Sequence, residues 1–179
     1  MIIAVAGRRV DADDAPVGRF PLKNVALVQQ RLDELFARES ATAMVSSGAC
    51  GADLAALSVA GARGMRRRMV LPFERDEFRA SSVTDRPGDW GPVYDRVLAE
   101  LDPTGDVVTL AGHVTGDTAY AAANDAILDE AETLARQGAT DVVALLVWEG
   151  APRDGADMTA GFGEAARKRG YRVEHVKTL

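Results

Sequence analysis

Short apolar runs alternate with amphipathic segments along this chain, and this alternation constrains the fold more than any other feature. Helices are expected where apolar residues recur at helical spacing, at 22–38, 119–136 and 158–168. Strands are expected where β-branched and small apolar residues gather, at 1–6, 42–45, 69–71, 106–110, 141–148 and, with more polar character, 171–174. The alternation predicts an α/β fold, a Rossmann-like three-layer sandwich with a mostly parallel central sheet flanked by helices. Ligands of such folds bind outside the carboxyl ends of the strands.

Length and charge limit the classes of partner. A chain of 179 residues is about one domain, so a single Rossmann-like domain is expected over 1–179. The formal net charge of −6 disfavours electrostatic attraction to nucleic acid or acidic lipid, so neither nucleic acid nor a membrane is expected as a partner. The start of the chain lacks signal-peptide features and the single cysteine cannot form an internal disulfide, which favours a cytoplasmic protein. A small ligand held by local groups is the partner these properties favour.

A glycine-containing turn joins the second strand directly to a helix. There, backbone N–H groups and the positive end of the helix dipole point at one place, which suits a phosphate. The glycine spacing matches neither the dinucleotide fingerprint nor a P-loop, and a tight structural turn would also explain it. The ligand-binding residues predicted in this turn are Ser46, Ser47, Gly48, Ala49, Gly51, Ala52 and Asp53.

Two charged residues refine this prediction. Asp53 lies in the first turn of the expected helix, where a carboxylate repels a phosphate placed against it but accepts hydrogen bonds from sugar hydroxyls. Simple complementation of the helix dipole is the alternative reading of Asp53. Arg8 follows the first strand beside Gly7, and its guanidinium group would either hold a phosphate or be an ordinary surface charge.

Other predicted binding residues follow the third and fifth strands, whose carboxyl ends lie at the same pole of a parallel sheet. Phe73, after Pro72, and Trp148 offer flat faces for stacking on a base, although aromatic residues at strand ends commonly close the core. Glu149 is a candidate for ribose hydroxyls. Glu149 and Asp53 are also the two weak candidates for acid–base catalysis.

Other chemistries find little support in the sequence. His113, His175 and Cys50 show no metal-ligand spacing, so neither a metal nor a cofactor is expected. A serine nucleophile at Ser46 or Ser47 would need His113 as its base, and Cys50 is interpreted as a buried space filler. The arginines at 66–68 precede the third strand, which predicts a solvated edge or partner contact at the pole opposite the glycine turn.

With these residues in view, the sequence resembles the SLOG superfamily, the Rossmann-like group named after the Smf/DprA proteins and the Lonely Guy phosphoribohydrolases. The resemblance covers nearly the whole chain, and within the group the chain is most similar to uncharacterised bacterial domains found with signalling modules. The matching segments are 5–8, 19–21, 47–53, 71–73 with Phe78, 81–83, Trp90, Tyr120 with Asn124, and 147–150. The resemblance implies binding of a nucleotide or an ADP-ribose-like signal, adds Asn124 and Thr159 to the predicted ligand-binding residues, and implies a homodimer.

One segment departs from the hydrolase branch of this superfamily. Those enzymes carry a loop of the form Pro-Gly-Gly-x-Gly-Thr-x-x-Glu after the fifth strand, and the corresponding segment here is 154–162. Thr159 matches the threonine, but the preceding glycines are replaced and Phe162 stands where the glutamate would be. Loss of that carboxylate favours binding without turnover, hence a nucleotide sensor or regulatory domain. The alternatives are a nucleoside 5′-phosphate N-glycosidase, in which Glu149 or Asp53 replaces the missing carboxylate, and a protein-interaction domain without a ligand.

Overall fold

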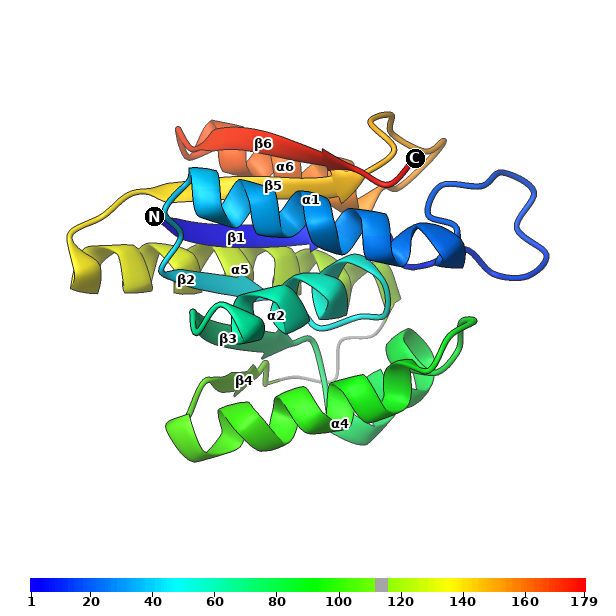
Figure 1. Ribbon diagram of the computed structural model, residues 1–179, viewed down its shortest axis with the longest axis horizontal. Helices are drawn as coiled ribbons and strands as arrows, with labels where there is room; N and C mark the ends of the chain where they lie inside the picture. The colour runs from blue at the N-terminus through cyan, green and yellow to red at the C-terminus, as the bar shows by residue number, and fades with distance from the viewer. Residues whose placement is uncertain (112–115) are drawn as a thin grey trace.

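The computed structural model describes residues 1–111 and 116–179. In these residues six parallel strands form one sheet in the order β4-β3-β2-β1-β5-β6, with helices on both faces (Figure 1). The Rossmann-like three-layer α/β fold predicted from the sequence is confirmed. The same part of the chain contains no helix with the length and apolar character that a membrane crossing requires.

The strands lie close to their predicted positions, and the largest differences in extent are in the third and the last strand. The third strand begins at Arg66 because its arginines pair with neighbouring carboxylates, Arg68 with Asp106 at 2.7 Å and Arg67 with Glu100 at 2.8 Å. The arginines were predicted to precede this strand, and that placement is wrong: they form its first three residues, at the pole opposite the glycine turn, and Arg66 is exposed. The last strand runs on to Lys177 because it pairs with its neighbour as far as Trp148. The strands are β1 (Ile2–Gly7), β2 (Ala43–Ser46), β3 (Arg66–Leu71), β4 (Val107–Thr109), β5 (Val142–Trp148) and β6 (Arg172–Lys177).

The helices divide between the two faces of the sheet. One face is covered by α1 (Val25–Arg38), α2 (Ala52–Ala62) and α4 (Trp90–Leu101), and the other by α5 (Gly116–Gly138) and α6 (Met158–Lys168) (Figure 1). The short helix α3 (Arg75–Phe78) and the helical turns Leu22–Asn24, Arg79–Val83 and Asp102–Thr104 complete the helical segments.

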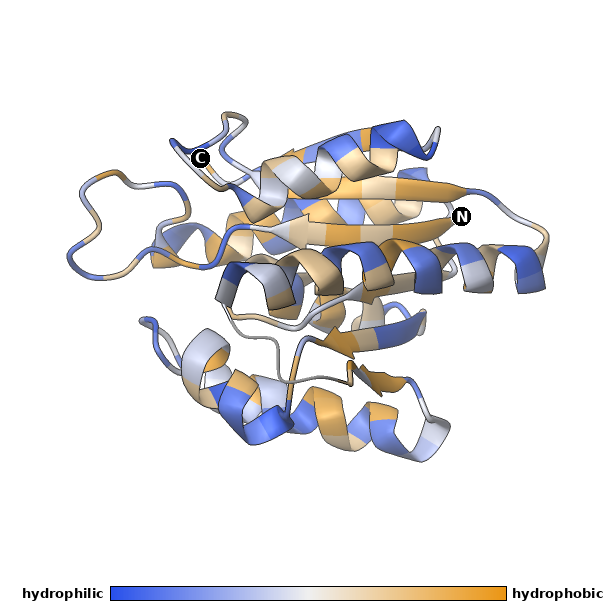
Figure 2. Ribbon diagram, turned by 180° about the vertical axis from the view of Figure 1, so that it is seen from behind, coloured by the Kyte–Doolittle hydropathy of each residue, from blue (hydrophilic) through white to orange (hydrophobic). Residues whose placement is uncertain are grey.

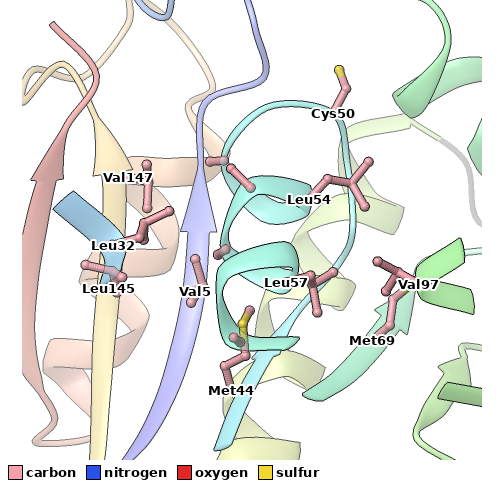
Figure 3. Close-up of a cluster of buried hydrophobic side chains, with 14 of the residues drawn as sticks. Val5, Leu32, Met44, Cys50, Leu54, Leu57, Met69, Val97, Leu145 and Val147 are labelled. Carbon is pink, nitrogen blue, oxygen red and sulfur yellow. The ribbon is translucent and has the colours of Figure 1, made fainter. Parts of the chain in front are cut away.

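The core follows from the alternation of side chains along each strand. Val5 of β1 and Met44 of β2 pack with Leu57 and other residues of α2 on one face (Figure 3). Their strand neighbours Ala4 and Val45 point the other way, toward α5 and α6. Central strands buried on both faces contain continuous apolar runs, and Figure 2 shows them as the most hydrophobic part of the molecule.

The order of the strands places a crevice beside β1. The chain moves outward from β1 through β2 and β3 to β4, and α5 then returns across the opposite face to β5 on the other side of β1. The connections after β1 and β5 therefore leave the sheet toward different faces. This reversal is the topological switch point at which open α/β sheets bind their ligands.

Candidate functional site

A cavity of about 640 Å³ lies at the switch point, at the carboxyl ends of β1 and β2. This volume falls within the usual range of small-molecule sites. The loop after β1, the turn before α2, the start of α5 and the segment around the start of α6 contribute to its walls. The predicted binding residues that line it are Gly7, Arg8, Ser47, Ala49, Asp53, Asn124 and Thr159.

The remaining predicted residues are not among the described residues that line the cavity: Ser46, Gly48, Gly51, Ala52, Pro72, Phe73, Trp148 and Glu149. The ring of Phe73 packs edge-on against Phe78 and Tyr120, each with centroids 5.9 Å apart. The ring of Trp148 stacks on His175, and its Nε1 donates a 2.8 Å hydrogen bond to His175 Nδ1. Both aromatic rings therefore belong to the core, which was the alternative reading of their sequence positions.

The glycine turn packs tightly against the chain that follows β1. Gly51 has φ of +90°, and a Cβ at this position would lie 2.7 Å from the backbone nitrogen of Val10. A Cβ on Gly7 would lie 2.4 Å from the Cβ of Ala52. These glycines are therefore required for the close approach of α2 to the β1 loop.

The backbone donors of this turn are largely engaged by the chain itself. The N–H of Cys50 donates to the carbonyl of Ser82, and the N–H of Ala52 donates to the carbonyl of Arg8, both at 3.0 Å. The N–H of Ala49 donates to the Asp53 carboxylate at 3.3 Å. The positive end of α2 thus already holds an anion, the side chain of Asp53 in its first turn.

Asp53 is the most unusual side chain in the cavity wall. Its Oδ2 accepts a 2.5 Å hydrogen bond from the hydroxyl of Ser47, and the residue is only 6% exposed. Its Oδ1 and the hydroxyl of the neighbouring strand residue Ser46 are buried without a hydrogen-bond partner among the described residues. Burial raises the pKa of Asp53 to about 6, against the opposing effect of the Ser47 hydrogen bond. A buried carboxyl group with a perturbed pKa in a cavity wall is typical of a functional site.

The raised pKa of Asp53 predicts how the stability of the protein depends on pH. A carboxyl group whose pKa rises from 3.8 to about 6 on folding stabilises the protein below pH 4, and this contribution disappears as the pH rises through 6. Relative to Asp53→Asn, the wild type should therefore lose about 2 kcal/mol of unfolding free energy between pH 4 and pH 7. Urea unfolding of both proteins across this range measures the difference. A difference independent of pH would contradict the assignment.

Arg8 lies at the end of β1 within a buried cluster of charges. Its Nε donates to Glu149 at 2.7 Å, its Nη1 donates to Asp157 at 2.8 Å, and its Nη2 also donates to the carbonyl of Ala151 at 2.9 Å. The side chains of Glu149 and Asp157 are only 10% and 4% exposed. Arg19, from the loop after β1, forms a further ion pair with Glu149. Arg8 and Glu149 are thus engaged with one another, and neither is positioned as a free group for phosphate or ribose.

Asp157 has a second role as the N-cap of α6. It accepts hydrogen bonds from the backbone N–H groups of Thr159 at 3.0 Å and Ala160 at 3.1 Å. Burial opposes ionisation, but the hydrogen bonds from Arg8 and from the backbone outweigh it and lower the pKa of Asp157 to about 2. Sequence reasoning missed this residue, although an aspartate just before a predicted helix is a capping signal.

Two arginines that line the cavity, Arg9 and Arg86, were also not among the predicted binding residues. Arg9 donates from Nη1 to both carboxylate oxygens of Asp85 at 2.8 Å and to the carbonyl of Ser81 at 3.0 Å. The Nε of Arg86 lies 3.5 Å from the same carboxylate. Arg9 and Arg86 both line the cavity. No sequence signal pairs them, because Arg9 and Asp85 meet only in the folded chain.

The remaining candidates for chemistry are Cys50, His113 and a metal site. The thiol of Cys50 is buried, and burial raises its pKa to about 11, so it is protonated near neutral pH. His113 lies outside the described residues. Within 1–111 and 116–179, no group of three or more histidine, cysteine or acidic side chains is arranged to hold a metal ion.

The fold and the cavity together define a Rossmann-like α/β domain with a cavity of small-molecule size at its switch point. No protein-family model matches the chain. No curated protein matches it either. Among solved structures it is similar to DNA processing protein A (DprA) from Streptococcus pneumoniae, with 15% sequence identity and a TM-score of 0.45. The similarity covers 96% of this chain but 57% of the DprA chain, so this chain spans little more than half the length of that protein.

Proposed function

We propose that the cavity binds a nucleotide or nucleotide-derived ligand and that the domain acts as a sensor or regulatory module. The observation that carries this proposal is the hydrogen-bonded pair of Ser47 and Asp53 in the cavity wall. Because the hydroxyl of Ser47 donates its proton to Asp53, the oxygen of Ser47 retains lone pairs for a donor in the cavity. A sugar hydroxyl is a donor of this kind.

The rest of the cavity fits the other parts of such a ligand. Apolar surface comes from Pro16 and Val17 in the loop after β1, from Tyr120 of α5 and from Met158 of α6, and this surface suits the face of a base. Asn124 is held by a 2.9 Å hydrogen bond from its amide nitrogen to the carbonyl of Met158, which leaves its amide oxygen as an acceptor. The site therefore combines an apolar wall with a few fixed polar groups.

A second function, nucleoside 5′-phosphate N-glycosidase, is favoured by one observation. Asp53 is a buried carboxyl group whose pKa of about 6 suits proton transfer near neutral pH. The other candidate, Glu149, is engaged by Arg8 and Arg19. The position of the hydrolase glutamate is occupied by Phe162, which is fully buried in the core. Asp53 would thus carry the acid–base chemistry of this alternative.

A ligand panel tests the proposal. Calorimetric titration with nucleoside 5′-monophosphates and ADP-ribose should show saturable binding, and thermal unfolding should shift upward with the ligand that binds. Ser47→Ala should weaken that binding about tenfold, since one hydrogen bond to the ligand is lost. The matched control is Ser58→Ala, because the Ser58 hydroxyl bonds the Leu54 carbonyl within α2 and should leave binding unchanged.

The outcomes separate the candidate functions. Binding without product supports the sensor, whereas chromatographic detection of released base supports the N-glycosidase. No binding of any panel member would overturn both and favour an interaction domain. Equal loss of binding in the Ser47 and Ser58 variants would show that Ser47 has no specific contact with the ligand.

A further inference from the structure

The phosphate of a nucleotide has few places in this cavity, because two of the helix starts there, those of α2 and α6, already carry a buried carboxylate. The start of α2 holds the carboxylate of Asp53, and the start of α6 holds that of Asp157. A phosphate placed against either would meet a like charge once these carboxylates are ionised. The glycine turn is therefore a poor phosphate site, despite its sequence pattern.

Arg8 is not available to bind the phosphate either. Its guanidinium group binds two buried carboxylates, those of Glu149 and Asp157. If Arg8 turned toward a ligand, both carboxylates would lose this buried partner. Removing one member of a buried ion pair leaves an uncompensated buried charge, which is strongly unfavourable.

Arg9 and Arg86 differ from Arg8 in exposure and in partner. They converge on the single carboxylate of Asp85, and their side chains are 29% and 28% exposed. Two cations sharing one anion leave one positive charge beside the cavity that both arginines line. Ion pairs at this level of exposure contribute little to stability, so Asp85 is readily exchanged for a stronger anion.

We infer that Arg9 and Arg86 form the phosphate subsite of the cavity and that the ligand carries a single phosphate monoester. This inference rests on the proposed function and sets the orientation of the ligand. The sugar lies toward Ser47 in the turn before α2, and the phosphate lies on the two arginines. The carboxylate of Asp85 occupies the position that the phosphate takes, because a carboxylate and a phosphate present similar pairs of oxygens to guanidinium groups.

The other carboxylates of the cavity limit the charge of the ligand. Asp117 and Asp154 are exposed and line the cavity together with Asp11, which accepts the backbone N–H groups of Arg19 and Phe20. Of the other arginines that line the cavity, Arg19 is paired with Glu149, and Arg153 lies 4.0 Å from the carboxylate of Asp157. Neither belongs to a pair of arginines that share one exposed carboxylate, as Arg9 and Arg86 do. A monophosphate is therefore favoured over a diphosphate or triphosphate.

Inorganic phosphate tests the subsite independently of any nucleotide. In NMR spectra of the arginine side chains, titration with inorganic phosphate should shift the Nε–H signals of Arg9 and Arg86 and leave that of Arg8 in place. Shifts confined to the backbone amides of 47–53 would overturn the inference.

Variants connect the subsite to the ligand. Arg9→Gln combined with Arg86→Gln should weaken binding of the nucleoside monophosphate selected by the panel about 10- to 100-fold, and binding of the matching nucleoside by less than twofold. Asp85→Asn should strengthen monophosphate binding. Arg96→Gln is the control, because its 4.0 Å ion pair with Glu100 lies within α4.

The failure of this inference differs from the failure of the proposed function. If nucleoside and monophosphate bind equally and the double variant binds both as the wild type does, the subsite is wrong while the nucleotide site stands. If neither binds but inorganic phosphate shifts Arg9 and Arg86, the anion subsite stands and the nucleotide proposal is wrong.

Discussion

Replacing Arg8 with methionine is expected to lower the free energy of unfolding by about 3–5 kcal/mol. The guanidinium group of Arg8 is the shared partner of Glu149 and Asp157, whose side chains are almost fully buried. Methionine fills a similar volume but leaves both carboxylates without that partner. Urea unfolding at pH 7 measures the loss.

The pH dependence of this loss identifies its cause. Because folding lowers the pKa of Asp157 from 3.8 to about 2, its contribution is present above pH 4 and is lost as the pH falls toward 2. The difference between wild type and Arg8→Met should therefore shrink in acid. Neutralising both partners as well, with Glu149→Gln and Asp157→Asn, should recover part of the lost stability at pH 7.

Arg9→Met is the matched control for Arg8→Met. It removes an arginine one position along the chain whose ion pair with Asp85 is much more exposed, so the expected change is within about 1 kcal/mol. Equal losses in the two variants would show that burial of the Arg8 cluster does not determine its contribution.

Gly7→Ala is expected to lower the unfolding free energy by about 3 kcal/mol through overpacking. The added methyl group would lie 2.4 Å from the Cβ of Ala52 and 2.6 Å from the carbonyl oxygen of Val147. Both contacts involve regular secondary structure, α2 and β5, which cannot shift as a flexible side chain does. Thermal and urea unfolding measure the effect.

Gly161→Ala provides the control for this substitution. Gly161 lies on the exposed side of α6, and within the described residues its added Cβ would meet nothing within 4 Å beyond its chain neighbours and the backbone of its own helix. Alanine should stabilise the helix there by up to about 1 kcal/mol, because it has the higher helix propensity. An unchanged unfolding free energy in Gly7→Ala would show that β1 and α2 have room to separate. The inference that the glycine turn requires close packing would then be wrong.

The sequence predicted the fold well because the signals involved are local. The helix expected at 158–168 matches α6, and the apolar run at 141–148 matches β5 within one residue. The third strand was placed too late because three arginines mask its start, and only the carboxylates of neighbouring elements explain their place in a strand.

The candidate site was predicted less completely because its contacts are not local. Asp53 and Ser47 lie six positions apart, and the sequence alone placed both in the same turn, where the structure joins them by a hydrogen bond. The sequence could not show that Asp53 would occupy the anion position of that turn. It also could not show that Trp148 would stack on His175, 27 positions away.

The sequence by itself therefore determined the alternation of strands and helices, the pole at which the strands end and the glycine turn that opens α2. Periodicity, glycine placement and apolar content act over a few neighbouring residues, so they can be read directly. Only the tertiary structure decided which charges were free: Arg8 pairs with a carboxylate 149 positions away, whereas Arg9 shares an exposed one with Arg86. The balance between desolvation and pairing fixes the role of each charged group, and both depend on residues that meet only when the chain is folded.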